Sequence, residues 1–290
     1  MARRPFPPDK SRRRPPPRDL GTGRATRSAA IPERDLDRIA GLPAVTALFD
    51  THRNRVHRLF FTPDMVAAAE PFLSVLAAAR RPYREVGPEE LERIAGTAMH
   101  GGIVALAEPR RINEARPEDL SRTSEPLLVL DGVGNPQNIG AIARTAAFFG
   151  LRRIVISDHP EQAAISDASF RIARGGLAYV DVLRAHNLPV FLAAMRTSHN
   201  VIGTALEGAR PLEQITADPT FSNRPALVVL GNEEQGLPRA TLKACATVVS
   251  LPGSGRVQSL NVSVTAGILI HALLRGAPIE PRPAPPRGRR

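Results

Sequence analysis

Residues 127–146 read LLVLDGVGNPQNIGAIARTA, and this stretch decides the fold class. Its first four residues are aliphatic and form the pattern of a buried strand, which a turn rich in Gly, Asn and Pro ends. An Ala-rich helical pattern follows, whose apolar stripe consists of Ile139, Ile142, Ala143, Ala146 and Phe149. Strand, turn and helix in this order predict one unit of an α/β fold, with a ligand site in the turn.

The alternation of strands and helices continues through the second half of the chain. Further buried-strand patterns occur at 153–157, 179–182, 201–204, 226–230 and 247–251, and helical patterns separate most of them. This arrangement predicts a mainly parallel sheet that helices cover on both faces. Ligand chemistry in such sheets belongs in the loops beyond the carboxyl ends of the strands.

A smaller α/β pattern precedes this sheet. Helical and strand patterns alternate at 46–53, 58–62, 66–79, 83–86, 88–94 and 100–106. The segment 110–124 is charged and poor in large apolar residues, which indicates a linker. We therefore predict a small α/β domain at 35–109, a linker at 110–124 and a larger domain at 125–276.

Basic, Pro-rich tails flank these domains. The formal charge is +11, of which residues 1–27 carry +7 and residues 278–290 carry +3, so the remaining body carries only +1. Few residues of the tails are apolar, and we predict disorder at 1–34 and 277–290. Such arms can add affinity for phosphates or simply add solubility, and the charge leaves both interpretations open.

Composition excludes several classes of protein. The single cysteine, Cys245, excludes an internal disulfide framework and a cysteine-rich zinc site. No run approaches the roughly 18 apolar residues of a membrane span, and the first residues contain no apolar signal segment. We expect a cytoplasmic protein without a membrane partner. Dinucleotide, Walker A, zinc-protease and serine-hydrolase motifs are all absent from the sequence.

Two further loops carry polar residues directly after predicted strands. In LGNEEQGLP (230–238), two glycines bracket Glu233, which can bind a hydroxyl or an amine or can simply lie near a helix start. In LPGSGRVQSLNVSVTAG (251–267), Ser259 and Asn261 begin an otherwise apolar helix. Small polar groups there are costly without partners, which favours a site over a plain helix cap.

Arg144 lies on the first helix among small residues. Its planar guanidinium suits a phosphate group, although a surface arginine with a carboxylate neighbour is the simpler interpretation of this residue alone.

Taken in order, the three loops resemble the SpoU family of RNA methyltransferases. Residues 135–146 match N-P-x-N-x-G-A-x-x-R-T-A, residues 231–236 match G-x-E-x-x-G, and residues 251–263 match L-P-x-x-G-x-x-x-S-L-N-V-S. Residues 41–109 resemble the family's L30e-like substrate-binding domain. The two-domain form is similar to the branch that modifies guanosine in 23S rRNA, although that branch usually has Asp where this chain has Asn135.

The resemblance implies a trefoil knot in the parallel sheet and a homodimer whose active site forms near the interface. It implies S-adenosylmethionine as cofactor, without a metal, held mainly by backbone groups; the expected binding residues are Thr204, Gly231, Leu251 and Leu260. Arg144 is expected to anchor the phosphate of the target nucleotide and to lower the pKa of its hydroxyl. Asn135 is expected to order the loop or the ribose, and Glu233, Ser259 and Asn261 to fix the loops and the substrate.

The function expected from this resemblance is methyl transfer from S-adenosylmethionine to a ribose 2'-hydroxyl of structured RNA, with a guanosine of 23S rRNA as the first expectation. Two alternatives stay open from the sequence. One is an inactive SpoU-like RNA-binding protein of ribosome assembly, and the other is a tRNA 2'-O-methyltransferase. The absence of phosphate-loop motifs disfavours a nucleotide-binding metabolic enzyme.

Overall fold

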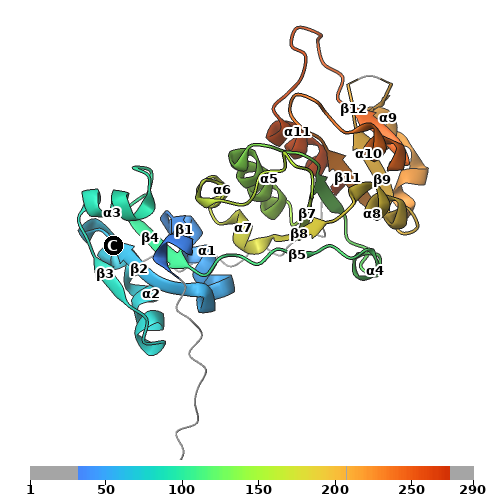
Figure 1. Ribbon diagram of the computed structural model, residues 1–290. Coiled ribbons are helices and arrows are strands. Elements are labelled where there is room, and N and C mark those ends of the chain that lie inside the picture. Colours follow the sequence, from blue (N-terminus) through green and yellow to red (C-terminus); the bar gives the residue numbers. More distant parts are fainter. Residues whose placement is uncertain (1–31, 207, 275–290) are drawn as a thin grey trace, which may run out of the picture.

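The computed structural model describes residues 32–206 and 208–274, so nearly all of the two predicted tails lies outside the described residues. Two β-sheets with flanking helices make up the described chain, and a single extended segment joins them (Figure 1).

The first sheet has four strands in the order β1-β4-β2-β3. Its strands are β1 (Asp37–Ala40), β2 (Val56–Phe61), β3 (Tyr83–Glu85) and β4 (Ile103–Ala107). Its helices and 3-10 turns are η1 (Glu33–Asp35), α1 (Leu42–His52), η2 (Arg53–Arg55), η3 (Pro63–Met65), α2 (Val66–Ala78) and α3 (Pro88–Ala95). β1 pairs antiparallel with β4 and was not predicted, because two of its four residues are charged.

The second sheet has eight strands in the order β10-β12-β9-β11-β6-β7-β8-β5, and every neighbouring pair is parallel. The strands are β5 (Asn113–Glu114), β6 (Leu127–Leu130), β7 (Arg153–Ser157), β8 (Asp181–Ala185), β9 (Asn200–Thr204), β10 (Arg210–Pro211), β11 (Ala226–Leu230) and β12 (Thr247–Ser250).

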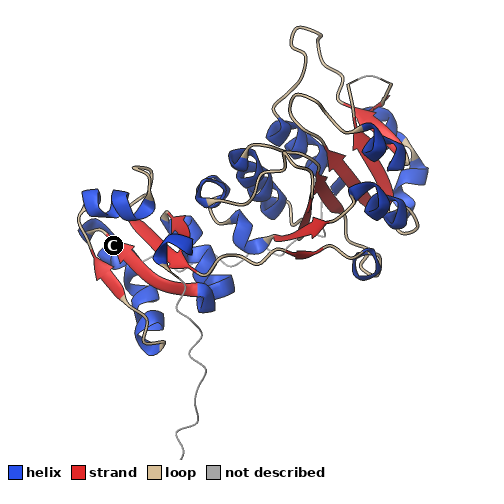
Figure 2. Ribbon diagram, in the orientation of Figure 1, coloured by secondary structure: helices blue, strands red, loops and turns tan. Residues whose placement is uncertain are grey.

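Helices cover both faces of this sheet (Figure 2). They are α4 (Pro117–Leu120), α5 (Pro136–Phe148), α6 (Asp167–Ala173), α7 (Gly176–Tyr179), α8 (Leu188–Met195), α9 (Leu212–Ala217), η4 (Pro219–Asn223), α10 (Arg239–Ala244), α11 (Val262–Leu269) and η5 (Ile270–Leu274). Alternate residues of β6 point to opposite faces: Leu128 and Leu130 pack in the core that contains α5 and α11, whereas Leu127 and Val129 pack in the core that contains α8. The predicted α/β fold class, a mainly parallel sheet with helices on both faces, is confirmed. The trefoil knot stays a prediction.

Two segments differ from the sequence-based expectation. The strand predicted at 179–182 is β8 at Asp181–Ala185, because Gly176–Tyr179 forms the short helix α7 after the positive-φ Gly175. The predicted linker at 110–124 contributes β5, which pairs in parallel with β8 at the sheet edge, and α4. Short apolar runs such as Leu177–Val180 fit a strand or a helix equally well, so periodicity alone misplaces them.

No helix within residues 32–206 and 208–274 combines the length and apolarity that crossing a membrane requires.

Stability is expected to depend on the buried His199. Its Nε2 lies 3.0 Å from the carbonyl oxygen of Glu125, and its Nδ1 lies 2.8 Å from Oγ of Ser198. Burial lowers the pKa of His199 below the ordinary 6.5, and the hydrogen bond to Glu125 opposes this only in part. As the pH falls below 6.5, the unfolded chain therefore binds the proton before the folded chain does, and the free energy of unfolding falls.

We expect His199→Gln to flatten this loss of stability below pH 6.5. Urea denaturation of both proteins at a series of pH values measures the slope. A variant whose stability falls as steeply as that of the wild-type protein would show that another group causes the dependence.

Candidate functional site

The loops singled out in the sequence lie at one edge of the eight-stranded sheet. β12, β9, β11 and β6 are consecutive parallel neighbours, so their carboxyl ends meet at the same edge. The loops beginning at Asp131, Gly231 and Leu251 follow three of these strands. The strand order thus places all three predicted loops around one region.

The first loop leads into α5 through a helix cap. Oδ1 of Asn135 accepts a hydrogen bond from the backbone N–H of Gln137 at 2.8 Å, and Pro136 occupies the first helical position. Cap and proline together fix where the helix begins. Asn135, predicted as a site residue, therefore has a structural role in positioning α5.

Asn138 joins all three loops, although sequence reasoning did not single it out. Its Nδ2 donates to Oε1 of Glu233 at 2.7 Å, and its Oδ1 accepts from Nδ2 of Asn261 at 3.2 Å. A side-chain amide can donate and accept at once, which suits it to link a carboxylate with a second amide. We call Glu233, Asn138 and Asn261 the polar triad. Asn138 lies within the N-P-x-N motif, and this position in a recognised motif was the signal available.

The second loop folds as a tight hairpin. Asn232 and Gly236 form an antiparallel bridge, and Oδ1 of Asn232 accepts from the N–H groups of Glu234 and Gln235 at 2.8 and 3.0 Å. A Cβ at Gly231 would lie 2.4 Å from the carbonyl carbon of Gly236, so only glycine fits there. The hairpin projects Glu233 toward α5, where its second oxygen also accepts from the N–H of Gly134 at 3.4 Å.

A fourth loop, between β7 and α6, supports the first. Oε1 of Gln162 accepts from the N–H groups of Gly132 and Val133 at 3.1 and 3.2 Å. Oε2 of Glu161 accepts from Nδ2 of Asn232 at 3.0 Å and so braces the hairpin as well. Sequence reasoning missed both residues. Their position after a strand that neighbours β6 could have indicated them.

The third loop ends at Asn261, which begins α11. Its Oδ1 accepts from the N–H and Oγ of Ser263 at 2.8 and 2.6 Å, while its Nδ2 belongs to the polar triad. Asn261 therefore both caps α11 and holds the start of this helix to Asn138. Ser259 is exposed and forms no hydrogen bond with any described residue, and Leu260 is 48% exposed beside it.

Three of the four residues expected to hold the cofactor lie at adjacent strand ends, and the fourth, Leu260, lies in the loop before α11. Thr204 ends β9 and donates from Oγ1 to the carbonyl of Val229 at 3.0 Å, which ties it to β11. Gly231 follows β11, and Leu251 follows β12 on the other side of β9. Gly231 is buried, and Thr204 and Leu251 are half-buried. Backbone groups at three adjacent strand ends can hold an elongated, partly apolar molecule.

Arg144 lies on α5 apart from the polar triad. Six residues separate it from Asn138, which turns its side chain by roughly 120° around the helix. Its side chain is exposed and makes no hydrogen bond or ion pair with any residue in the described ranges. Its backbone is closely packed, since a Cβ at Gly176 would lie 2.7 Å from Cα of Arg144. The guanidinium is thus available for a ligand while its helix is held in place.

Cys245 is half-buried, lies two residues before β12, and is not expected to act as a nucleophile. Burial raises the pKa of its thiol to about 12, so the thiol stays protonated. Within the described ranges, no three His, Cys, Asp or Glu side chains gather as metal ligands would.

Models of two known protein domains match the two parts of this chain. Residues 125–271 match the model of the SpoU rRNA Methylase family, and residues 38–112 match the model described as RNA 2'-O ribose methyltransferase substrate binding. The 23S rRNA (guanosine-2'-O-)-methyltransferase RlmB of Acinetobacter baylyi is 32% identical over 81% of this chain and 95% of its own length. An uncharacterized tRNA/rRNA methyltransferase of Haemophilus influenzae is 34% identical over 80% of this chain, which spans 65% of that relative.

Solved structures share the fold. The SpoU methyltransferase AviRb of Streptomyces viridochromogenes, in complex with AdoMet, superposes with a TM-score of 0.67 at 21% identity, covering 83% of this chain and 90% of that one. Because the family model spans all three loops and the polar triad that joins them, this chain belongs to the SpoU rRNA methylase family and is an RNA 2'-O-ribose methyltransferase.

Proposed function

We propose that this protein transfers a methyl group from S-adenosylmethionine to the ribose 2'-hydroxyl of a guanosine in 23S rRNA. The observation that carries the proposal is the polar triad, through which Asn138 joins the three family loops at the carboxyl edge of the sheet. Relatives from Acinetobacter baylyi and Pasteurella multocida that bear the guanosine-specific name are matched over 95% and 98% of their lengths. Both therefore share the two-domain organisation of this chain.

The strand ends fit S-adenosylmethionine. Gly231 is buried at the end of β11, beside the ends of β9 and β12, and the backbone of Gly236 fills the place that a Cβ would take there. Thr204, Gly231, Leu251 and Leu260 would hold the cofactor, chiefly through backbone groups. The cofactor supplies a methyl group bonded to a positively charged sulfur, which makes the methyl carbon electrophilic.

Arg144 positions the acceptor. A ribose hydroxyl is a weak nucleophile until its proton leaves, and a nearby positive charge stabilises the alkoxide that develops. The guanidinium of Arg144 binds the phosphate next to the target ribose and lowers the pKa of the hydroxyl. A guanidinium only donates hydrogen bonds and does not accept a proton, so the proton of the hydroxyl passes to another acceptor such as the RNA phosphate.

The polar triad keeps the loops in register during transfer. Glu233 holds the hairpin to α5 through Asn138, and Asn261 holds the start of α11 to the same amide. Ser259, which has no partner among the described residues, is free to contact the substrate. Asn135 acts one step further away, by fixing the first turn of α5.

A second copy of this chain is the proposed partner of the α5–α11 face. Val264 and Ile268, four residues apart on α11, are 50% and 38% exposed, and Phe148 at the end of α5 is 81% exposed. Phe148 contacts Phe149, whose ring centroid lies 5.5 Å from that of His271 in η5, and α11 itself packs against α5, so the exposed apolar side chains of α5 and α11 belong to neighbouring helices. Arg144 lies one helical turn before Phe148 and therefore borders this face. A homodimer through it would bury the surroundings of Arg144.

Ile268→Asp is expected to weaken this dimer by at least about a hundredfold, because a buried, unpaired carboxylate costs about 3 kcal/mol or more. Sedimentation equilibrium measures the dissociation constant. The matched control is Val190→Asp, since Val190 is 63% exposed on α8 at the opposite face of the sheet. Equal effects of the two variants, or a monomeric wild-type protein, would exclude this interface.

The function is tested by mapping 2'-O-methylated nucleotides in total RNA from cells with and without the gene. Loss of one 2'-O-methylguanosine from 23S rRNA supports the proposal. Loss of a methyl group from tRNA would reassign the substrate, and an unchanged map would favour the inactive RNA-binding alternative.

A further inference from the structure

The two sheets share one continuous core. Ile39, Ala44 and Leu48 of the first domain belong to the same buried cluster as Phe170 and Leu177 of the second. One cavity between these surfaces measures about 10 Å³, close to the smallest space that holds one water molecule. Buried side chains of the two domains therefore pack against each other, so the extended segment is not the only connection between the two domains among the described residues.

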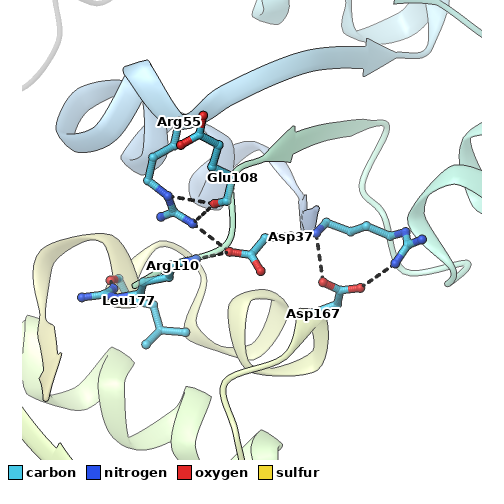
Figure 3. A network of polar contacts seen from close by, with 7 residues as sticks. Asp37, Arg55, Glu108, Arg110, Asp167 and Leu177 are labelled. Carbon is cyan, nitrogen blue, oxygen red and sulfur yellow. Dashed lines mark hydrogen bonds and ion pairs between the residues drawn. The ribbon is translucent and has the colours of Figure 1, made fainter. Parts of the chain in front are cut away.

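A polar network closes the same interface (Figure 3). The guanidinium of Arg110 donates to the carbonyl oxygens of Leu177 in α7 and of Val180, which directly follows α7, and its side chain is only 11% exposed. The backbone N–H of Arg110 donates to Asp37 of β1 at 3.0 Å, and Nη2 of Arg55 donates to the same carboxylate oxygen at 2.7 Å. Arg110 thus holds α7 through its side chain and β1 through its backbone.

A second contact holds β1 to α6 through Arg38, the residue after Asp37. The backbone N–H of Arg38 donates to Oδ1 of Asp167 in α6 at 2.9 Å, and its Nη1 donates to Oδ2 at 3.3 Å. Asp37 and Arg38 are neighbours in the chain, so β1 is held to α7 and to α6 at once. Two separate contacts restrict rotation between the domains more than one contact does.

Two adjacent glycines bring α7 into contact with both domains. A Cβ at Gly175 would lie 2.8 Å from the carbonyl oxygen of Pro43 and 2.9 Å from Cβ of Ala47, both in α1. A Cβ at Gly176 would lie 2.7 Å from Cα of Arg144 and 2.9 Å from the carbonyl oxygen of Ala143, both in α5. α7 therefore lies between α1 of the first domain and the backbone of Arg144 in α5, and it packs closely against both.

We infer that α7 and Arg110 fix the substrate-binding domain against the helix of Arg144, and that Arg110 is a positioning residue for methyl transfer. The inference rests on the proposed function. It explains how RNA that is bound to the substrate-binding domain is aligned with Arg144 in the second domain. RNA bound to the first domain reaches Arg144 in one orientation because α7 spans the distance between them. Loosening the contact between Arg110 and α7 leaves the RNA site of the first domain and the cofactor site of the second domain intact. The bound RNA then reaches Arg144 in the productive orientation less often.

The test compares Arg110→Ala with Arg111→Ala, which removes the same charge from the next, exposed residue. Spin labels on cysteines introduced at Glu92 in α3 and Glu213 in α9 report the distance between the domains, with excess unlabelled chain added so that only distances within one chain count. Cys245 is half-buried, and burial raises the pKa of its thiol to about 12, which slows its reaction with the label. The same proteins are assayed for kcat, for KM toward rRNA and for S-adenosylmethionine binding.

We expect Arg110→Ala to broaden the distance distribution and to lower kcat by on the order of ten- to a hundredfold, since small misalignments are costly in transfer reactions. KM and the dissociation constant of S-adenosylmethionine should change less than about twofold. Arg111→Ala should match the wild-type protein in all four measurements.

An unchanged distribution in Arg110→Ala, or a broadened one with wild-type kcat, would overturn the inference. If Arg110→Ala does not fold, Asp167→Ala is used instead, because it removes the more exposed contact between Asp167 and Arg38. This variant must also broaden the distance distribution and lower kcat, each by less than is expected for Arg110→Ala. A wild-type protein that transfers no methyl group would refute the proposed function, while the distances would still decide whether the domains are fixed.

Discussion

Arg144→Ala is expected to lower kcat for methyl transfer by about a hundred- to a thousandfold and to leave S-adenosylmethionine binding unchanged. The expectation follows from the position of Arg144, which is exposed on α5 without a partner among the described residues and separate from the strand ends proposed to hold the cofactor. The variant loses the charge that stabilises the developing alkoxide. It keeps every contact that orders the loops.

Single-turnover kinetics with rRNA and calorimetry with S-adenosylmethionine measure the two quantities separately. Arg152→Ala is the matched control, because Arg152 directly precedes β7, at the opposite, amino edge of the sheet. Arg144→Lys keeps the charge and loses the planar fork, so it should fall between the wild-type protein and Arg144→Ala. Near wild-type turnover in Arg144→Ala would refute the assignment.

Gly231→Ala is expected to raise the dissociation constant of S-adenosylmethionine at least about tenfold. The added Cβ would lie 2.5 Å or less from the carbonyl group of Gly236, which is backbone and cannot move without opening the hairpin. The shift displaces the backbone groups proposed to hold the cofactor and moves Glu233 away from Asn138.

Calorimetry again gives the affinity, and circular dichroism checks that the chain is folded. Gly87→Ala serves as the control, because a Cβ at Gly87 meets no atom within 4 Å and its φ is −68°. Cofactor affinity equal to that of the wild-type protein would mean that the hairpin does not form part of the cofactor site.

The sequence predicts those elements whose residues satisfy a local rule. Leu127–Leu130, Arg153–Ser157 and Ala226–Leu230 are strands at the predicted residues, because each is an aliphatic run that ends at a turn or a polar loop. β1 was missed because its stability comes from pairing with β4 and from contacts of Asp37 and Arg38 with distant residues. α7 was misplaced because its position depends on close packing against α1 and α5.

In the candidate site, too, some residues follow from local sequence motifs and others only from contacts between distant segments. Sequence motifs identified the loops that carry Glu233 and Asn261, and the structure brings these two residues together. Asn138 gains its role only because β11 lies between β9 and β6, an order that no local pattern contains. The same holds for Gln162, which supports the first loop from 30 residues away. Asn135 was correctly placed in the loop, yet its observed contact is that of a helix cap.

The central claim is that these loops bring a methyl donor to a ribose hydroxyl. The most direct test is incubation of the purified protein with 23S rRNA and S-adenosylmethionine labelled in its methyl group, followed by digestion to nucleosides and mass spectrometry. We expect label in 2'-O-methylguanosine, reduced about a hundred- to a thousandfold in rate by the Arg144→Ala substitution. Label on a base, or no transfer by a protein that binds S-adenosylmethionine, would contradict the central claim.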